Sequence, residues 1–155
     1  MANKQYFTGT YLHTLDERGR IAIPARLREK LGEMVSVVRG RGNCLVVYPH
    51  EAWITMAEQV LAKPGRNPIL NPVEEDEAMR MFSEVWDGEM DKQGRIPIPD
   101  YLRQDAKLIS DVAVVGLGDH IQIWDKEAWL ARRADLRRSP PVAQVTRPAE
   151  RTAEA

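Results

Sequence analysis

An aspartate and an arginine four residues apart form the pattern in this sequence that is best suited to chemistry. The pair is Asp16 and Arg20, separated by a turn that contains Gly19, and the pattern recurs as Asp91 and Arg95. A carboxylate beside a guanidinium can hold its planar donors in one orientation, as recognition of phosphate or guanine requires. The same pair can also brace a turn, which contributes about 0 to 1 kcal/mol when it is exposed. Spacing alone leaves both interpretations open.

Basic side chains surround both patterns, although the chain as a whole has a net charge of −1 and offers no general attraction for nucleic acid. The bases are Arg18, Arg20, Arg26, Arg28 and Lys30 around the first pattern, and Lys92, Arg95, Arg103 and Lys107 around the second. The segment 71–91 is instead strongly acidic and contains a single base, Arg80. We therefore expect a polyanion to be met by one face of the molecule and repelled by another.

No other set of residues has a spacing typical of catalysis or cofactor binding. His13, His50 and His120 are scattered, with no zinc-site spacing and no H-E-x-x-H motif. A nucleophile elbow and a Walker loop are missing from the sequence, and Gly40-Arg41-Gly42 is better explained by a hairpin turn than by a dinucleotide fingerprint. We expect no enzyme activity, metal, cofactor or small-molecule substrate.

The two patterns belong to an internal duplication. The segment 16–24 recurs as 91–99, and after a one-residue insertion the match continues to the segments that contain Trp53 and Trp129. Neither copy alone has enough apolar surface for a core, so two copies suggest one pseudo-twofold module. Function should lie on the side that both copies present together.

Each copy is predicted to form strand, tight turn, strand, short helix, hairpin and longer helix. Asp16 and Gly19 occupy the first and fourth positions of a type I turn, and glycine supplies the left-handed conformation that would close a bulged hairpin. Further strands are expected at 21–23 and 96–98, hairpins at 34–38 with 44–48 and at 112–115 with 121–124, and an amphipathic helix from Trp53 to Leu61.

A break at residues 63–68 is followed by signals of a new helix, with Asn71 as the cap and Pro72 at the first helical position. This helix would link the copies through Ala78, Met81, Phe82 and Val85 on one face. The single cysteine, Cys44, lies in an apolar run and is interpreted as a small buried side chain rather than a reactive thiol. The missing signal-peptide core and membrane span predict a cytosolic protein.

At these residues the sequence resembles the MraZ family of bacterial transcriptional regulators. The first set of matching residues is Phe7, Gly9, His13, Leu15, Asp16, Gly19, Arg20, Ile21, Ile23 and Pro24, followed by Leu45, Val47, Tyr48, Pro49 and Trp53. The second set contains Glu89, Asp91 to Ile96, Ile98 and Pro99, then Ile123 to Glu127 and Trp129. The likeness covers about Tyr6 to Leu136 and contains two motifs in order. Pro97 departs from the pattern, which typically has an aliphatic or small residue at this position, and the proline removes a backbone donor from its strand.

The resemblance implies an α+β fold in which two AbrB-like halves interlock swapped hairpins into a small β-barrel with peripheral helices. It also implies a homo-oligomeric ring that binds short G-rich direct repeats in promoter DNA of the division and cell-wall gene cluster, including its own. The family signature maps onto Asp16 and Arg20 and again onto Asp91 and Arg95, which implies that they bind DNA, with Arg20 as the main contact. From the basic residues around the motifs we also expect Arg18 and Lys92 to contact DNA. Such a protein would lie in the cytoplasm, associated with the nucleoid.

The expected domain boundaries are residues 6–63 for the first repeat, 64–83 for the linker and connecting helix, 84–136 for the second repeat and 137–155 for a disordered tail. A ring-forming scaffold that binds protein instead of DNA is the alternative from another class. An AbrB-type antitoxin fits less well, because such proteins usually have one short half and a long toxin-binding tail. The sequence does not decide between repression and activation, the number of subunits or the bases that are read.

Overall fold

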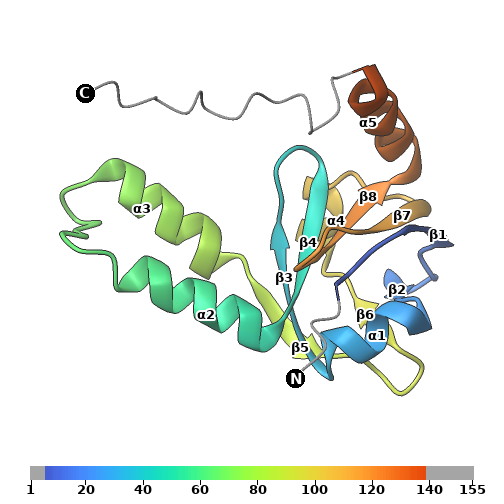
Figure 1. The fold of residues 1–155 in the computed structure, drawn as a ribbon, viewed down its shortest axis with the longest axis horizontal. Helices are drawn as coiled ribbons and strands as arrows, with labels where there is room; N and C mark the ends of the chain where they lie inside the picture. The colour runs from blue at the N-terminus through green and yellow to red at the C-terminus, as the bar shows by residue number, and fades with distance from the viewer. Residues whose placement is uncertain (1–5, 139–155) are drawn as a thin grey trace, which may run out of the picture.

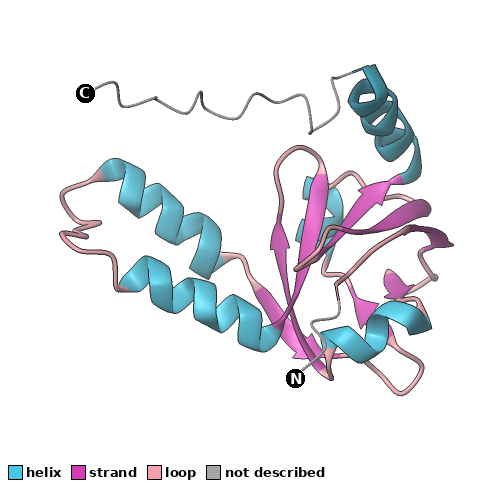
Figure 2. Ribbon diagram, viewed as in Figure 1, coloured by secondary structure: helices cyan, strands magenta, loops and turns pink. Residues whose placement is uncertain are grey.

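The computed structural model describes residues 6–138 as a sheet-centred α+β body from which a pair of helices projects (Figures 1 and 2). The strands are β1 (Thr10–Thr14), β2 (Arg20–Ala22), β3 (Met34–Arg39), β4 (Cys44–Pro49), β5 (Trp86–Glu89), β6 (Arg95–Pro97), β7 (Asp111–Gly116) and β8 (Ile121–Asp125). The helices are α1 (Ala25–Leu31), α2 (His50–Leu61), α3 (Pro72–Ala78), the π-helical segment η1 (Met79–Ser83), α4 (Asp100–Asp105) and α5 (Lys126–Arg138). The predicted order of elements in each copy is therefore observed.

The larger sheet is antiparallel and has six strands in the order β1-β7-β8-β4-β3-β5. In the duplication β1 corresponds to β5, β3 to β7 and β4 to β8. Exchanging each strand for its counterpart reverses the strand order, so the sheet is pseudo-twofold symmetric. The first strand of each copy pairs with the hairpin of the other copy, β1 with β7 and β5 with β3. Each half thus depends on the other to complete its sheet, and both predicted hairpins are confirmed.

The smaller sheet contains only β2 and β6, which pair antiparallel with Ile21 opposite Ile96. Both isoleucines have no exposed surface, as expected for the inward-facing residue of each strand. They join one apolar cluster with Leu27, Leu102 and residues of the larger sheet. Within residues 6–138 the larger sheet ends at β1 and β5, so the expected closed barrel is not observed. A barrel would require these two edge strands to pair with each other.

The bulged turn predicted at the first motif is confirmed, but its two flanking strands do not continue as a paired hairpin. The turn itself forms, because Gly19 N donates to Asp16 O (3.0 Å) and Asp16 N donates to Arg20 O (2.9 Å). The flanking strands then diverge, since β1 pairs with β7 while β2 pairs with β6. Burying Ile21 against Ile96 requires β2 to leave β1, and this long-range contact outweighs a local ladder of three residues.

The remaining local predictions agree with the structure, with two corrections. Val85, expected on the connecting helix, lies beyond the end of η1 at Ser83, and the C-terminal helix is longer than expected. Asn71 caps α3, because its Oδ1 accepts from Val73 N (3.0 Å) and Glu74 N (3.4 Å). Cys44 is fully buried, and burial raises the pKa of its thiol to about 11. Helix α5 continues to Arg138, so residues 137 and 138 of the expected tail are helical. Arginine is a good helix former and is favourable near a helix C-terminus. Residues 139–155 lie outside the described part.

Helices α2 and α3 form the projecting arm, on the left in Figure 1, while α5 lies at the upper right. Trp53 of α2 is 7% exposed and meets the ring of Phe82 from η1 edge-on, with centroids 5.8 Å apart. The predicted helix stripe therefore anchors the linker to the first copy. No helix of residues 6–138 has the length and apolar character to cross a membrane.

Candidate nucleic-acid interface

The first turn is organised around the carboxylate of Asp16. Its Oδ1 accepts the backbone amides of Arg18 (2.9 Å) and Arg20 (2.8 Å), and its Oδ2 accepts the side-chain Nε of Arg20 (2.6 Å). Gly19 completes the turn at φ 72°, in the left-handed region that favours glycine. The carboxylate therefore satisfies the turn backbone and holds the guanidinium through its Nε.

The second turn repeats this geometry closely. Asp91 Oδ1 accepts the amides of Gln93 and Arg95, both at 2.9 Å, and its Oδ2 accepts Arg95 Nε at 2.7 Å. Gly94 has φ 73°. The bracing ion pair and an oriented arginine are thus both present in each copy, and the geometry satisfies the two interpretations together.

Hydrogen bonding lowers the pKa of both carboxyl groups. For Asp16 the main cause is the backbone amide of Arg20, followed by its side chain and the amide of Arg18, while burial opposes the shift. For Asp91 the amide of Arg95 is the main cause, and burial again opposes it. Both aspartates therefore stay ionised at neutral pH and remain acceptors for their arginines.

Pairing of β2 with β6 brings the two turns together. Arg20 lies opposite Pro97 and Ala22 lies opposite Arg95 in the register of the small sheet. Arg20 Nη1 reaches 4.0 Å from Asp91 Oδ2, a carboxylate of the other copy. The missing donor of Pro97 does not break the pairing, because Ile23 N and Ile98 N donate to the glycine carbonyls of the opposite turns (2.9 and 3.1 Å). Two distant motifs therefore form one surface.

Two further arginines, which the sequence prediction did not assign to the site, pack across this surface. Arg103 of α4 lies against Gly19, and Arg28 of α1 lies against Gly94, so close that a side chain on either glycine would collide with the arginine. Arg28 Nη1 also donates to Gln93 O (3.3 Å). The repeated Leu-Arg pairs at 27–28 and 102–103 were the signal that could have identified them.

These two arginines differ in their partners. Arg103 forms an ion pair with Asp100, whereas the equivalent position before Arg28 is Ala25. Within residues 6–138, Arg28 Nε is buried without a hydrogen-bond partner. Arg28 of α1 therefore has no ion-pair partner among the described residues, whereas the charge of Arg103 of α4 is partly neutralised by Asp100.

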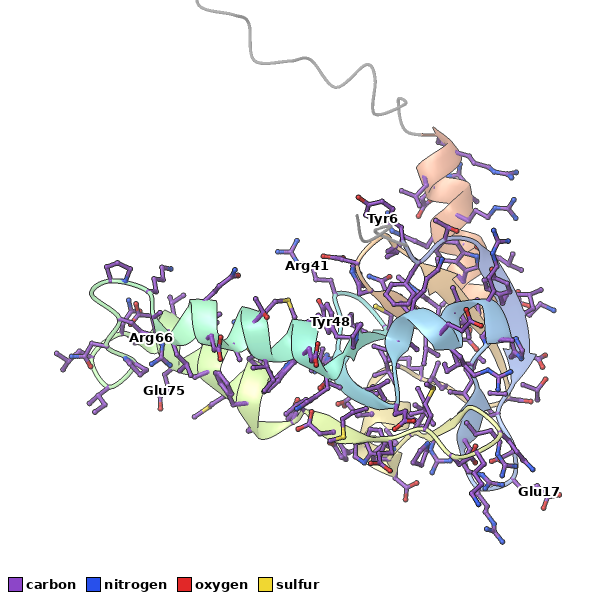
Figure 3. All side chains as sticks on the ribbon, turned by 60° about the horizontal axis from the view of Figure 1, so that its bottom comes forward. Tyr6, Glu17, Arg41, Tyr48, Arg66 and Glu75 are labelled. Atoms are coloured by element: carbon purple, nitrogen blue, oxygen red, sulfur yellow. The ribbon has the colours of Figure 1, made fainter. Side chains whose placement is uncertain are left out.

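Arg18 and Lys92, the other predicted contacts, are exposed and form no ion pair among the described residues. They occupy different positions in their turns, since Arg18 corresponds to Gln93 and Lys92 corresponds to Glu17. Glu17 points outward from the tip of its turn in Figure 3. Each tip therefore carries one base, and only the first tip also carries an acid.

A serine–histidine–aspartate cluster appears away from this surface. Ser36 Oγ donates to Asp87 Oδ1 (2.6 Å) and lies 2.9 Å from His50 Nδ1. Ser36 has no exposed surface, so a substrate has no access to its hydroxyl. The cluster instead ties β3, β5 and α2 together. Among residues 6–138 no group of three or more His, Cys, Asp or Glu side chains could hold a metal ion.

Comparison with known proteins gives one consistent result. The model of the family described as "MraZ protein, putative antitoxin-like" matches residues 6–69 and 81–152. "Transcriptional regulator MraZ" from Lachnoclostridium phytofermentans is 42% identical over 130 residues, which cover 83% of this chain and 88% of the relative. Proteins of the same name from Carboxydothermus hydrogenoformans and Roseiflexus castenholzii are each 40% identical, over 79% of this chain and 83% of their own lengths.

Proposed function

The chain belongs to the MraZ family, and we propose that it is a sequence-specific DNA-binding transcriptional regulator. The names of its relatives support the class of function. The observation that carries the proposal is the pairing of β2 with β6, which places two carboxylate-oriented arginines on one surface.

Arg20 and Arg95 are the proposed base-reading or phosphate-clamping residues. Each guanidinium is held through Nε, which leaves the two Nη groups as donors for guanine or for a phosphate. Asp16 and Asp91 set the orientation of these side chains. Arg18 and Lys92 at the turn tips supply contacts to phosphates, which add affinity without sequence information.

The family resemblance supports the finer parts of the proposal. The target is promoter DNA with short G-rich repeats in the division and cell-wall gene cluster, read by a ring of subunits in the cytoplasm at the nucleoid. The exchanged strands support two interlocked AbrB-like halves, residues 6–63 and 84–136, joined by the linker 64–83. Several subunits on tandem sites would compensate for the low net charge of one chain.

A ring-forming scaffold without DNA binding is the second candidate. The ion pairs Asp16–Arg20 and Asp91–Arg95 are compatible with this candidate, because a purely structural role in bracing the turns would also explain them. The two candidates differ in what the loss of one arginine does, because a brace supports the fold while a DNA contact does not.

The test is promoter binding by Arg20→Ala and Arg95→Ala. Loss of a base contact costs about 1 to 3 kcal/mol per engaged subunit, so a gel shift with the upstream DNA of the gene should weaken sharply for Arg20→Ala. Unfolding temperature and assembly size should stay near those of the wild type. Arg66→Ala, at the far end of the arm in Figure 3, is the matched control and should bind normally.

Undiminished binding by both turn variants at moderate salt would refute the proposed contacts. Loss of assembly together with loss of binding would favour the bracing role and the scaffold.

A further inference from the structure

Helix α5 has a groove that is equivalent to the groove beside α2. The groove at α5 is about 770 Å³ in volume and is lined by Trp124, Trp129, Arg132 and Leu136 among others. The groove at α2 is lined by Tyr48, Trp53, Met56 and Val60, which occupy the corresponding positions of the first copy. The duplication thus provides two versions of one surface within a single chain.

Within residues 6–138, only the groove of the first copy has a helix against it. Glu77 and Met81 of the α3–η1 segment form its far wall, and Phe82 of the same segment packs on Trp53. Helix α2 consequently has two buried residues, Trp53 and Ala57, whereas α5 has none. Leu136, at the end of the second groove, is 48% exposed. Among residues 6–138, no helix takes the equivalent place beside α5.

The charges of α5 and α3 are opposite. Helix α5 contains five bases and two acids, whereas α3 contains four acids and no base. None of the four carboxylates of α3 forms an ion pair with another described residue, and neither do Arg132 and Arg133 of α5. Each helix therefore presents charge that residues 6–138 leave without an ion-pair partner.

The outer face of α3 also carries apolar side chains. Val73 of α3 is 70% exposed and Met79, the first residue of η1, is 54% exposed, and Glu75 and Asp76 lie between them in the sequence. This mixture of exposed apolar and acidic side chains complements the tryptophan, leucine and arginine side chains of the α5 groove.

We infer that the outer face of α3 in one molecule docks into the α5 groove of a second molecule. This inference rests on the self-assembly in the proposed function and names the two surfaces through which the subunits would meet. The arm and α5 project from different ends of the body, so α3 does not reach the α5 groove of its own molecule and the contact is head-to-tail (Figure 1). A head-to-tail contact closes into a ring when the rotation between neighbours allows it. Neither face includes the paired turns, so DNA-binding residues stay outside the contact.

The charge of residues 139–155 favours a second molecule, rather than this C-terminal segment, as the occupant of the α5 groove. Residues 139–155 contain two arginines and two glutamates and are neutral overall, so they offer no complement to the bases of α5. Helix α3 offers four negative charges in seven residues.

A charge-swap experiment on the full chain tests this contact without DNA. One variant carries Arg132→Glu and Arg133→Glu, and the other carries Glu75→Arg and Asp76→Arg. Light scattering should show a large wild-type assembly and a loss of assembly for each variant alone, because like charges then meet at every contact. An equal mixture should recover the wild-type mass, because each variant supplies the partner that the other needs. Glu51→Arg with Glu58→Arg on α2 makes the same change in charge as the α3 variant and should assemble normally.

Misfolded variants would not recover on mixing, so recovery supports the docking directly. Assembly that survives in both variants overturns the inference and leaves a ring built on another surface. No recovery from two variants with wild-type circular dichroism also overturns it. If the wild type is monomeric, both the docking contact and the ring are refuted. The gel shift measures DNA binding independently, so the proposed DNA contact would still be tested. Assembly unchanged in both variants but lost after truncation behind Arg138 would assign the contact to residues 139–155.

Discussion

At the scale of single residues, each turn depends on an aspartate that accepts three hydrogen bonds at once. Two of them come from backbone amides that the turn would otherwise leave unsatisfied, and the third comes from an arginine Nε. Because the arginine bond is one of three, the turn does not need arginine to form. The repeated arginine is therefore free to serve recognition, while the aspartate serves both the fold and the orientation.

The lowered pKa values of Asp16 and Asp91 predict a loss of stability in acid. Each carboxyl is a stronger acid in the folded state than in the unfolded chain, where its pKa is about 3.9. The contribution to stability is thus fully present above the unfolded pKa and is lost as the pH falls through the folded pKa. Thermal unfolding between pH 7 and pH 2.5 measures this loss.

The matched variant for that measurement is Asp16→Asn with Asp91→Asn. Its amide oxygens can still accept the backbone amides, but they do not titrate. The fall in unfolding temperature below about pH 4 should be smaller than in the wild type. An equal fall in both proteins would show that other carboxylates dominate the acid response.

At the scale of elements, short pieces of structure are stabilised by partners far along the chain. Strands β2 and β6 have three residues each, and neither could persist without the other and the core beneath them. The Ser36, His50 and Asp87 cluster similarly fixes the first strand of the second copy against the first copy. Helix α3 differs, because it combines a local cap with the lack of any buried residue.

Removal of the cap should therefore loosen the arm selectively. Asn71→Ala should cost about 1 kcal/mol in the stability of α3, because two amides at the start of the helix lose their acceptor. Amide hydrogen exchange should accelerate in α3 and η1 while the sheet stays protected. Asn71→Ser keeps an acceptor and should exchange nearly as the wild type does. Equal acceleration throughout the sheet would mean that the arm is not an independent unit.

At the scale of the whole molecule, the pseudo-twofold arrangement separates two kinds of surface. Both copies contribute turns to one surface at β2 and β6, whereas α2 and α5 have diverged in apolar and charged character. Symmetry is kept where the proposed DNA contact lies and is lost where the proposed assembly contact lies. A head-to-tail contact needs such asymmetry, because its two faces are different.

Tandem binding by several subunits predicts a dependence of the salt effect on the number of repeats. The logarithm of affinity should fall with the logarithm of salt concentration by about 0.9 for each phosphate neutralised on duplex DNA. A promoter fragment with several G-rich repeats should therefore give a much steeper slope than a fragment with one. Fluorescence titration of both fragments over a range of salt measures the slopes. Equal slopes and affinities would mean that one subunit supplies all contacts.

The sequence by itself determined the features that arise within a few residues. The two turns follow from the spacing of aspartate and glycine, the start of α3 follows from Asn71 and Pro72, and both long hairpins follow from apolar runs around a glycine-containing loop. The duplication also indicated that the two motifs share one side of the molecule. Such features are set by backbone conformation and local hydrogen bonds, which nearby residue types are enough to specify.

Only the tertiary structure decided how strands of one copy pair with strands of the other. The local pattern suggested that the strands beside the first turn pair with each other, but β2 leaves to bury Ile21 against Ile96. That exchange brings Arg20 close to Asp91 and packs Arg103 and Arg28 onto the opposite turns. The choice among partners depends on how much apolar surface the whole chain removes from water, and this sum is taken over residues far apart in the sequence. The sequence therefore contained the motifs, and the fold made them a single surface.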